Sequence, residues 1–283
     1  SSEEIRREWL PSVIRGDRII CLALTEPGCG SDAAALTTRA VREGDHYVLS
    51  GEKTSITQGM QADAALLFAK TDPAARARGV SCFLVPLDLP GVVRSRLPSM
   101  GFRPLMAASI ILDGVRIPAR YRMGEEGRGF HMVMGQFDVI RPCLGLAALG
   151  AAQASLEEAI AYAKQRTAFG QPIGKFEGVS FKIAEHLTRM EAARWLCYRT
   201  LWLRDQSIPH TRESAMCKWL CPEVAVQAIH DALLLHGHLG YSEEYPIEQR
   251  LRDVIGLEIG DGTAQIMKLI ITREVLGREF PPY

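Results

Sequence analysis

The stretch Ile19-Ile20-Cys21-Leu22-Ala23-Leu24-Thr25-Glu26-Pro27-Gly28-Cys29-Gly30-Ser31-Asp32 decides how the first half of this chain folds. It is an apolar run that leads into a glycine-rich loop. The segment from Gly28 to Ala33 fits G-x-G-x-x-A, which marks a dinucleotide-binding unit only where a helix follows the loop. Short strands follow here instead, so the sequence disfavours NAD binding. The loop is either an ordinary turn or a set of hydroxyl and backbone N–H groups that bind a polar, flat or phosphorylated ligand.

Short apolar runs on both sides of this loop predict a β domain over residues 17–120. They cover residues 19–24, 47–50, 64–69, 81–85, 92–95 and 109–112, and turn signals such as Asp72-Pro73 and Asp113-Gly114 separate them. Closely spaced strands without helices between them are typical of an antiparallel β barrel or sandwich. The amphipathic residues 3–14 predict a helix, and we interpret residues 1–16 as the helical remnant of a preceding domain.

The pattern changes to helical periodicity after Pro118. Residues 129–169, 177–204, 212–238 and 261–276 are predicted to be helices with short connections. Such helices pack as an antiparallel four-helix bundle, here over residues 121–283. The predicted fold is therefore an α+β multidomain architecture, with a β domain followed by a helical bundle.

Composition excludes several functional classes. Lys plus Arg and Asp plus Glu both total 33 in 283 residues, so the net charge of zero argues against binding to nucleic acid or an anionic membrane. No uninterrupted apolar run approaches the length of a membrane span, and the first residues do not resemble a signal peptide. The 7 cysteines lack metal-binding spacing and are interpreted as mostly buried, reduced thiols. His236 and His238 do not share a helical face, so no metal site is predicted.

Two polar groups in the helical half are candidates for chemistry. Asp261 lies between Gly260 and Gly262, directly before a predicted helix. It is either an acid held close to a substrate or simply the N-cap of that helix. Asp138 and Arg141 lie three residues apart on one helix face, either as a surface ion pair or as a polar grip on a ligand.

The order of six motifs resembles the acyl-CoA dehydrogenase family, and the match covers essentially the whole chain. The motifs are Thr25-Glu26-Pro27-Gly28-x-Gly30-Ser31-Asp32, Gly51-Glu52-Lys53-x-x-Ile56-Thr57, Phe137-Asp138-x-x-Arg141, Arg166-x-x-Phe169-Gly170, Tyr245-Pro246-x-Glu248 with Leu251-Arg252-Asp253, and Gly262-Thr263-x-Gln265. The resemblance implies a middle β domain and a C-terminal helical domain. The family's leading helical domain is expected to be absent from these residues.

The resemblance also implies FAD as the cofactor. The residues that match flavin-binding positions of the family are Leu22, Leu24, Thr25, Gly30, Ser31, Ser55, Ile56, Thr57, Arg166, Phe169, Leu234, His236, Gly237, His238, Thr263 and Gln265. Ser55 stands where the family often has Trp, and Leu234 stands where Gln is usual, so one stacking contact and one hydrogen bond to FAD are expected to be missing. Arg166, Phe169 and residues 234–238 match positions that reach a neighbouring subunit's FAD, which implies a homotetramer.

The acyl-CoA substrate is expected to contact the residues that match the family's thioester site. These residues are Ser31, Phe137, Asp138, Arg141 and Gly262. By the same resemblance, an enzymatic base removes the α proton of the thioester while the β hydrogen leaves as a hydride to FAD. Electrons then pass to an electron-transfer flavoprotein, in the bacterial cytoplasm or in the mitochondrial matrix.

Asp261 matches the position where most of the family has a glutamate base. A subset of the family places its glutamate at the position of Ile140, which cannot act as a base. The Asp side chain is shorter by one C–C bond, about 1.5 Å. This pattern resembles dehydrogenases of alicyclic acyl-CoA such as cyclohexanecarboxyl-CoA, so a cyclic or branched acyl group is expected.

Two alternatives stay open at this point. The same fold can serve as a reductase or act on a carrier-protein thioester. The chain can also be a non-catalytic homologue that binds flavin, which Ser55, Leu234 and the short acid would favour.

Overall fold

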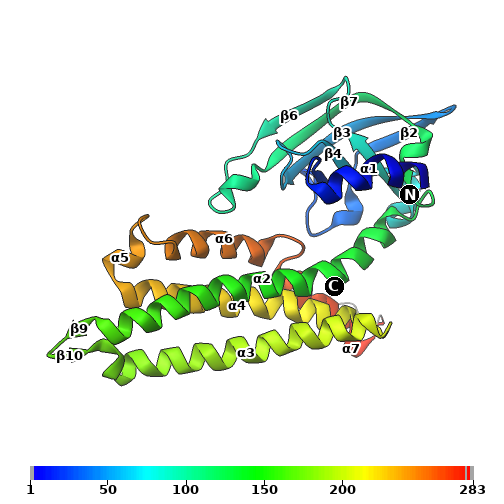
Figure 1. The fold of residues 1–283 in the computed structure, drawn as a ribbon. Helices are drawn as coiled ribbons and strands as arrows, with labels where there is room; N and C mark the ends of the chain where they lie inside the picture. The colour runs from blue at the N-terminus through cyan, green and yellow to red at the C-terminus, as the bar shows by residue number, and fades with distance from the viewer. Residues whose placement is uncertain (1–2, 278, 281–283) are drawn as a thin grey trace. The chain divides into compact units, whose positions relative to one another are not determined.

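The computed structural model describes residues 3–277 and 279–280 of the chain (Figure 1). The chain forms two compact units, Ser1–Gly135 and Gln136–Tyr283, and the division between them falls inside helix α2 (Gly129–Gln165). Each unit is described by itself.

The first unit is built on one eight-stranded sheet. Its strands run in the order β6-β7-β3-β2-β4-β5-β8, and β1 pairs in parallel with β4. The strands are β1 (Ile20–Ala23), β2 (Arg39–Glu43), β3 (His46–Ile56), β4 (Ala64–Lys70), β5 (Val80–Pro86), β6 (Val92–Arg96), β7 (Ala108–Pro118) and β8 (Arg122–Met123). Most neighbouring pairs are antiparallel, which confirms the predicted β domain. Strand β2 was not predicted because only Ala40 of its five residues is buried.

The helical pieces of the first unit are short. Helix α1 (Glu3–Arg15) contributes the buried Ile5 and Trp9 to the same apolar core as the sheet. Short 3-10 turns occupy Ala33–Ala35, Pro73–Gly79, Arg103–Leu105 and Ala119–Tyr121, and the second of them is kinked at Arg76. Only the first of these turns separates the glycine-rich loop from β2, so the helix that a dinucleotide fingerprint requires does not follow the loop.

A buried ion pair holds the start of the glycine-rich loop. Glu26 and Lys53 are 5% and 0% exposed, and Lys53 Nζ lies 2.8 Å from Glu26 Oε1. The Glu26 carboxylate also accepts hydrogen bonds from the backbone N–H and the hydroxyl of both Thr37 and Thr38. Burial alone would raise the pKa of Glu26, but the hydrogen bonds from Lys53 and Thr38 and the charge of Lys53 lower it to about 2.

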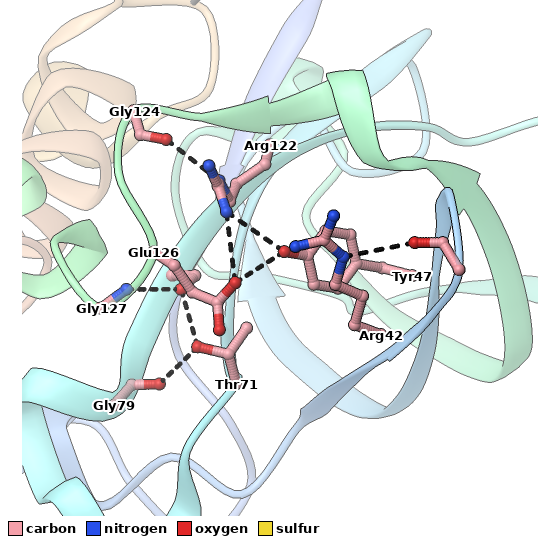
Figure 2. Close-up of polar contacts among 10 residues, drawn as sticks. Arg42, Tyr47, Thr71, Gly79, Arg122, Gly124, Glu126 and Gly127 are labelled. Carbon is pink, nitrogen blue, oxygen red and sulfur yellow. Dashed lines mark hydrogen bonds and ion pairs between the residues drawn. The ribbon is translucent and has the colours of Figure 1, made fainter.

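A second polar cluster ties the segment after β8 to the sheet (Figure 2). The Tyr47 hydroxyl donates to Glu126 Oε2 at 2.7 Å, and the Arg122 guanidinium donates to both of these residues. The backbone N–H of Gly127 donates to the Ser81 hydroxyl at 2.8 Å. These contacts fix residues 122–127 against strands β3 and β5, directly before α2 begins.

The second unit is a helical bundle whose long helices run in alternating directions (Figure 1). Its helices are the C-terminal part of α2, α3 (Glu177–Asp205), α4 (Thr211–His236), α5 (His238–Tyr241), α6 (Ile247–Ile259) and α7 (Ala264–Leu276). The strands β9 (Thr167–Ala168) and β10 (Gln171–Pro172) form a small hairpin after α2, and a 3-10 turn covers Ile173–Lys175. The bundle was predicted, but helix α6 was not, although Ile247, Leu251 and Val254 recur at helical spacing.

Small residues allow the bundle helices to pack closely. A Cβ atom on Gly145 of α2 would lie 3.1 Å from the sulfur atoms of both Cys197 in α3 and Cys221 in α4. All seven cysteines are free, and all but Cys143 are buried, in keeping with the predicted reduced thiols. By length and composition alone, α2 could cross a membrane, a property that the search for uninterrupted apolar runs missed. Ala148, Leu149, Ala152 and Leu156 of α2 are buried in the bundle core, which accounts for this apolar character.

Replacement of the buried carboxylate should destabilise the first unit. We expect Glu26→Gln to lower the free energy of unfolding at pH 7 by about 3–5 kcal/mol, because Lys53 would stay buried without its counter-charge. The stabilisation by wild-type Glu26 is present above its ordinary pKa of 4.5 and is lost as the pH falls toward its folded-state value of about 2. Urea unfolding followed between pH 2 and pH 7 measures both effects.

The exposed ion pair between Glu43 and Arg116 provides the control, since the two side chains are 52% and 56% exposed. Glu43→Gln should cost less than about 1 kcal/mol. Equal unfolding free energies for the two variants would contradict the importance of the buried pair.

Close packing at Gly145 predicts a second stability effect. Gly145→Val should destabilise the helical unit by about 1–3 kcal/mol, because the new side chain overlaps the two cysteine sulfurs. Gly150 lies in the same helix with nothing within 4 Å of an added Cβ, so Gly150→Ala should stabilise by about 0.5–1 kcal/mol. Thermal unfolding of both variants tests the pair, and similar melting temperatures would refute close packing at Gly145.

Candidate functional site

The glycine-rich loop has small exposed residues at its tip and a hydrogen-bonded turn where it begins. Gly28, Gly30 and Ser31 are exposed. The base of the loop is a tight turn in which Glu26 and Cys29 exchange backbone hydrogen bonds of 3.0 and 3.1 Å. The loop can therefore present backbone groups to a ligand while the Glu26–Cys29 turn holds it in place.

The two segments predicted to meet the flavin in the first unit are joined to each other. The backbone N–H of Thr54 donates to the Thr25 carbonyl at 2.9 Å, and Lys53 Nζ donates to the Leu24 carbonyl at 3.0 Å. Ser55 and Thr57 are exposed, whereas the side chains of Leu24 and Ile56 are buried. Any contact of these two buried residues with a ligand would thus come from the backbone.

Ser55 has an unusual backbone conformation. Its φ is +56°, and it lies where the pairing of β3 with β7 shifts register between Lys53 and Ile56. A bulge of this kind redirects a side chain and is frequent next to binding sites. A non-glycine residue at positive φ is uncommon, which makes the position a candidate for function.

A pocket of about 400 Å³ gathers the second set of predicted flavin residues in the helical unit. Its lining contains Arg166, Leu234, His236, Gly237 and His238, together with Tyr162, Ile173, Leu235 and Leu239. The His236 ring stacks on Tyr162 at 4.5 Å, and its Nδ1 donates to the Ala232 carbonyl at 2.8 Å. A cation, two imidazoles and apolar side chains thus meet around one pocket.

Phe169 is the predicted flavin residue of this group that does not line the pocket. It lies at the tip of the β9–β10 hairpin with a φ of +51°, next to Gly170 with a φ of +81°. Positive φ at both turn residues is the pattern of a type I′ turn. Phe169 is 96% exposed. The centres of the Phe169 and Phe176 rings are 6.2 Å apart, and the rings are nearly perpendicular.

Asp261 does not cap the helix that follows it. The N-cap of α7 is Thr263, whose hydroxyl oxygen accepts the backbone N–H of Ile266 at 3.4 Å. Asp261 instead has a φ of +55°, in the turn between α6 and α7. The alternative interpretation of Asp261 as an N-cap is therefore wrong. Gln265, the other predicted flavin residue here, is exposed in the first turn of α7.

The predicted thioester-site residues of the helical unit meet at this turn. Arg141 Nε donates to the main-chain carbonyl of Asp261 at 3.2 Å, and Arg141 NH1 lies 3.5 Å from Asp138 Oδ1. The guanidinium also lies 5.3 Å from the centre of the Phe137 ring. Because Arg141 is only 4% exposed, its contact with Asp138 is not the surface ion pair of the simpler interpretation.

Sequence inspection missed Lys218 of α4, which also belongs to this cluster. Its Nζ donates to the carbonyls of Leu257 at 2.5 Å and Gly262 at 3.2 Å. The side chain is 1% exposed. Lys218 lies on the same face of α4 as the apolar Ala215 and Cys221. A charged residue on a core-facing side needs a partner, so this pattern could have marked Lys218 as a candidate.

The surroundings set the protonation of these groups in opposite directions. Although Asp261 as a residue is exposed, the surrounding chain desolvates its carboxyl group and raises its pKa, while Lys218 and Arg141 oppose the rise. Burial lowers the pKa of Lys218 to about 8, and Asp261 and Glu258 oppose that fall. A carboxyl group whose pKa is raised by desolvation, in a turn held by two cations, can accept a proton near neutral pH.

Comparison with known proteins matches both units. Residues 21–115 match the sequence model described as "Acyl-CoA dehydrogenase, middle domain", and residues 127–276 match "Acyl-CoA dehydrogenase, C-terminal domain". The mouse mitochondrial short-chain specific acyl-CoA dehydrogenase is 40% identical over 276 residues, which cover 97% of this chain and 67% of that protein. The 3-(aryl)acrylate reductase of Clostridium sporogenes is 37% identical and covers 97% of this chain and 73% of its own length.

A solved structure agrees with the sequence comparisons. The acyl-CoA dehydrogenase from Geobacillus kaustophilus superimposes with a TM-score of 0.94 at 37% identity, over 97% of this chain and 73% of that one. Both matched segments, the level of identity and the shared fold lead to one conclusion. The chain belongs to the acyl-CoA dehydrogenase family of FAD-dependent oxidoreductases.

Proposed function

We propose that the chain catalyses the α,β-dehydrogenation of an acyl-CoA thioester with Asp261 as the base. The observation that carries this proposal is the position of Asp261 in a turn whose main-chain carbonyls are bound by the buried cations Arg141 and Lys218. Desolvation in this turn raises the pKa of the Asp261 carboxyl group. Desolvation makes the carboxylate a stronger base, and the two cations keep it ionised at working pH. FAD, when bound, accepts the β hydrogen as a hydride.

The pocket residues of the helical unit fit part of FAD. Arg166 suits a pyrophosphate, because a guanidinium binds phosphate oxygens in a fixed geometry. Apolar side chains such as Leu234 and Ile173 suit the flat face of an adenine. The loop of the first unit offers backbone groups and the Ser31 hydroxyl, which we assign to the flavin and the thioester.

The length of the base favours a particular class of acyl group. Asp261 is shorter than the usual glutamate by about 1.5 Å. A misplacement of that size costs roughly 100-fold in rate unless the substrate compensates. A cyclic or α-branched acyl group that brings its α carbon closer to Asp261 would provide that compensation.

Further parts of the proposal follow from membership of the family. We propose that the electrons pass to an electron-transfer flavoprotein. We also propose that the chain assembles as a homotetramer whose subunits share FAD sites. The exposed Phe169 beside the pocket hairpin supports a role for this region at a subunit interface. Relatives include mitochondrial and bacterial enzymes, and we place this chain in the cytoplasm of a bacterium or in the mitochondrial matrix.

A second candidate is the reverse reaction, and the 3-(aryl)acrylate reductase relative favours it. In that direction Asp261 would donate the α proton instead of removing it. A carrier-protein thioester in place of CoA, or flavin binding without catalysis, are further outcomes of the same experiment. The experiment is an anaerobic panel of straight, branched and ring acyl-CoA thioesters scored by bleaching of the flavin absorbance. Bleaching by a ring or branched member supports the proposal, and absence of bleaching by any member overturns it.

Replacement of the proposed base should separate binding from catalysis. We expect Asp261→Asn to retain bound FAD and to lose exchange of the substrate α proton by at least about 1,000-fold, because the amide cannot accept the proton. Asn also tolerates the positive φ of this position. Exchange is measured by deuterium incorporation from solvent. Dehydrogenation by Asp261→Asn at the wild-type rate would rule out Asp261 as the base.

The pocket predicts opposite effects for two substitutions. Arg166→Gln should weaken FAD retention by about 10- to 100-fold, since one charge-assisted contact to phosphate is lost. Leu234→Gln should strengthen retention, because it restores the amide that the family usually has. Dialysis against potassium bromide followed by flavin absorbance measures both. If neither substitution changes the retained FAD, the pocket is not part of the FAD site.

A further inference from the structure

Lys218 is a buried cation whose hydrogen bonds go to the main chain. It is 1% exposed, and its two acceptors are the carbonyl oxygens of Leu257 and Gly262. A buried ammonium group is costly unless its donors are satisfied. These two carbonyls therefore account for the position of the Lys218 head group.

The two acceptors bracket the turn that carries Asp261. Leu257 is in the last turn of α6, where helix carbonyls lack an intrahelical partner, and Gly262 directly follows Asp261. Arg141 donates to the carbonyl of Asp261 itself at 3.2 Å. Lys218 thus joins the beginning and the end of the turn from inside, while Arg141 holds its middle.

Lys218 also acts on Asp261 through its charge. Of the two cations that oppose the rise in the pKa of Asp261, Lys218 has the larger effect and Arg141 the smaller. Asp261 and Glu258 favour the charged form of Lys218, whereas burial and Arg141 disfavour it. Burial and the charge of Glu223 in turn raise the pKa of Glu258, and Lys218 opposes that rise.

We propose that Lys218 is a positioning residue for the Asp261 carboxylate. Its ammonium group fixes the turn between α6 and α7 and holds the carboxylate ionised near neutral pH. The inference rests on the proposed role of Asp261 as the base. Lys218 itself does not exchange a proton with the substrate.

The test compares Lys218→Met with the wild type as full-length, FAD-loaded proteins. Amide hydrogen exchange of residues 257–265 should become about 5- to 100-fold faster, because two buried carbonyls lose their donor. The acid limb of the pH profile for α-proton exchange should move to higher pH, because loss of the cation raises the pKa of Asp261. Lys218→Arg restores the charge and should return the acid limb toward the wild-type pH.

Lys182→Met is the matched control in the same unit. Lys182 is 48% exposed and pairs with Asp231 at 2.8 Å. This variant should change neither exchange in residues 257–265 nor the pH profile. If Lys218→Met does not fold, Lys218→Gln keeps a donor but not the charge. It should show a smaller change in amide exchange and a similar shift of the acid limb.

The outcomes separate the two proposals. Wild-type exchange in residues 257–265 together with an unchanged acid limb in a folded Lys218 variant overturns the role of Lys218, even where Asp261→Asn abolishes α-proton exchange. Retained α-proton exchange in Asp261→Asn overturns the base instead. In that case faster amide exchange in Lys218→Met still supports anchoring of the turn, and unchanged amide exchange overturns it.

Discussion

Burial of a lysine ammonium group against main-chain carbonyls is the constraint on which both candidate regions depend. Lys53 binds the Leu24 carbonyl below the glycine-rich loop, and Lys218 binds the Leu257 and Gly262 carbonyls around Asp261. Both side chains are at most 1% exposed. A charge in such a place cannot be left unpaired, so each lysine allows its loop a narrow range of positions.

The two lysines differ in how their charge is balanced. Lys53 has the carboxylate of Glu26 at 2.8 Å, and that carboxylate also accepts hydrogen bonds from Thr37 and Thr38. Lys218 has two neutral carbonyls as hydrogen-bond acceptors, and burial lowers its pKa to about 8. Burial also lowers the pKa of Lys53, and there Glu26 opposes the fall. The Glu26–Lys53 pair is a structural anchor, whereas the charge of Lys218 remains available to act on Asp261. On our proposal, this difference lets Lys218 both support the turn and act on Asp261.

The chain departs from its family at positions that concern the cofactor and the reach of the base. Leu234 makes the pocket wall more apolar, and Ser55 leaves an exposed hydroxyl at a bulge where a large aromatic is usual. Asp261 is short, yet it is held in a defined turn by two buried cations. On the proposed function, a short base at Asp261 and a small side chain at Ser55 would together favour a bulky acyl group.

Sequence by itself determined most strands of the β domain, the three longest bundle helices and the family, whereas β2, β8 and α6 were missed. It did so because alternation, helical periodicity and the order of Gly-, Asp- and Arg-containing motifs are local properties of the chain. The family resemblance also identified Asp261, Arg141 and five of the pocket residues, Arg166, Leu234, His236, Gly237 and His238, as candidates. Only the tertiary structure showed that Thr263, not Asp261, caps α7. It also showed that Lys218 binds the carbonyls of Leu257 and Gly262, about 40 residues away in the sequence. Burial, desolvation and hydrogen bonds between distant residues arise from packing, and no local pattern encodes them.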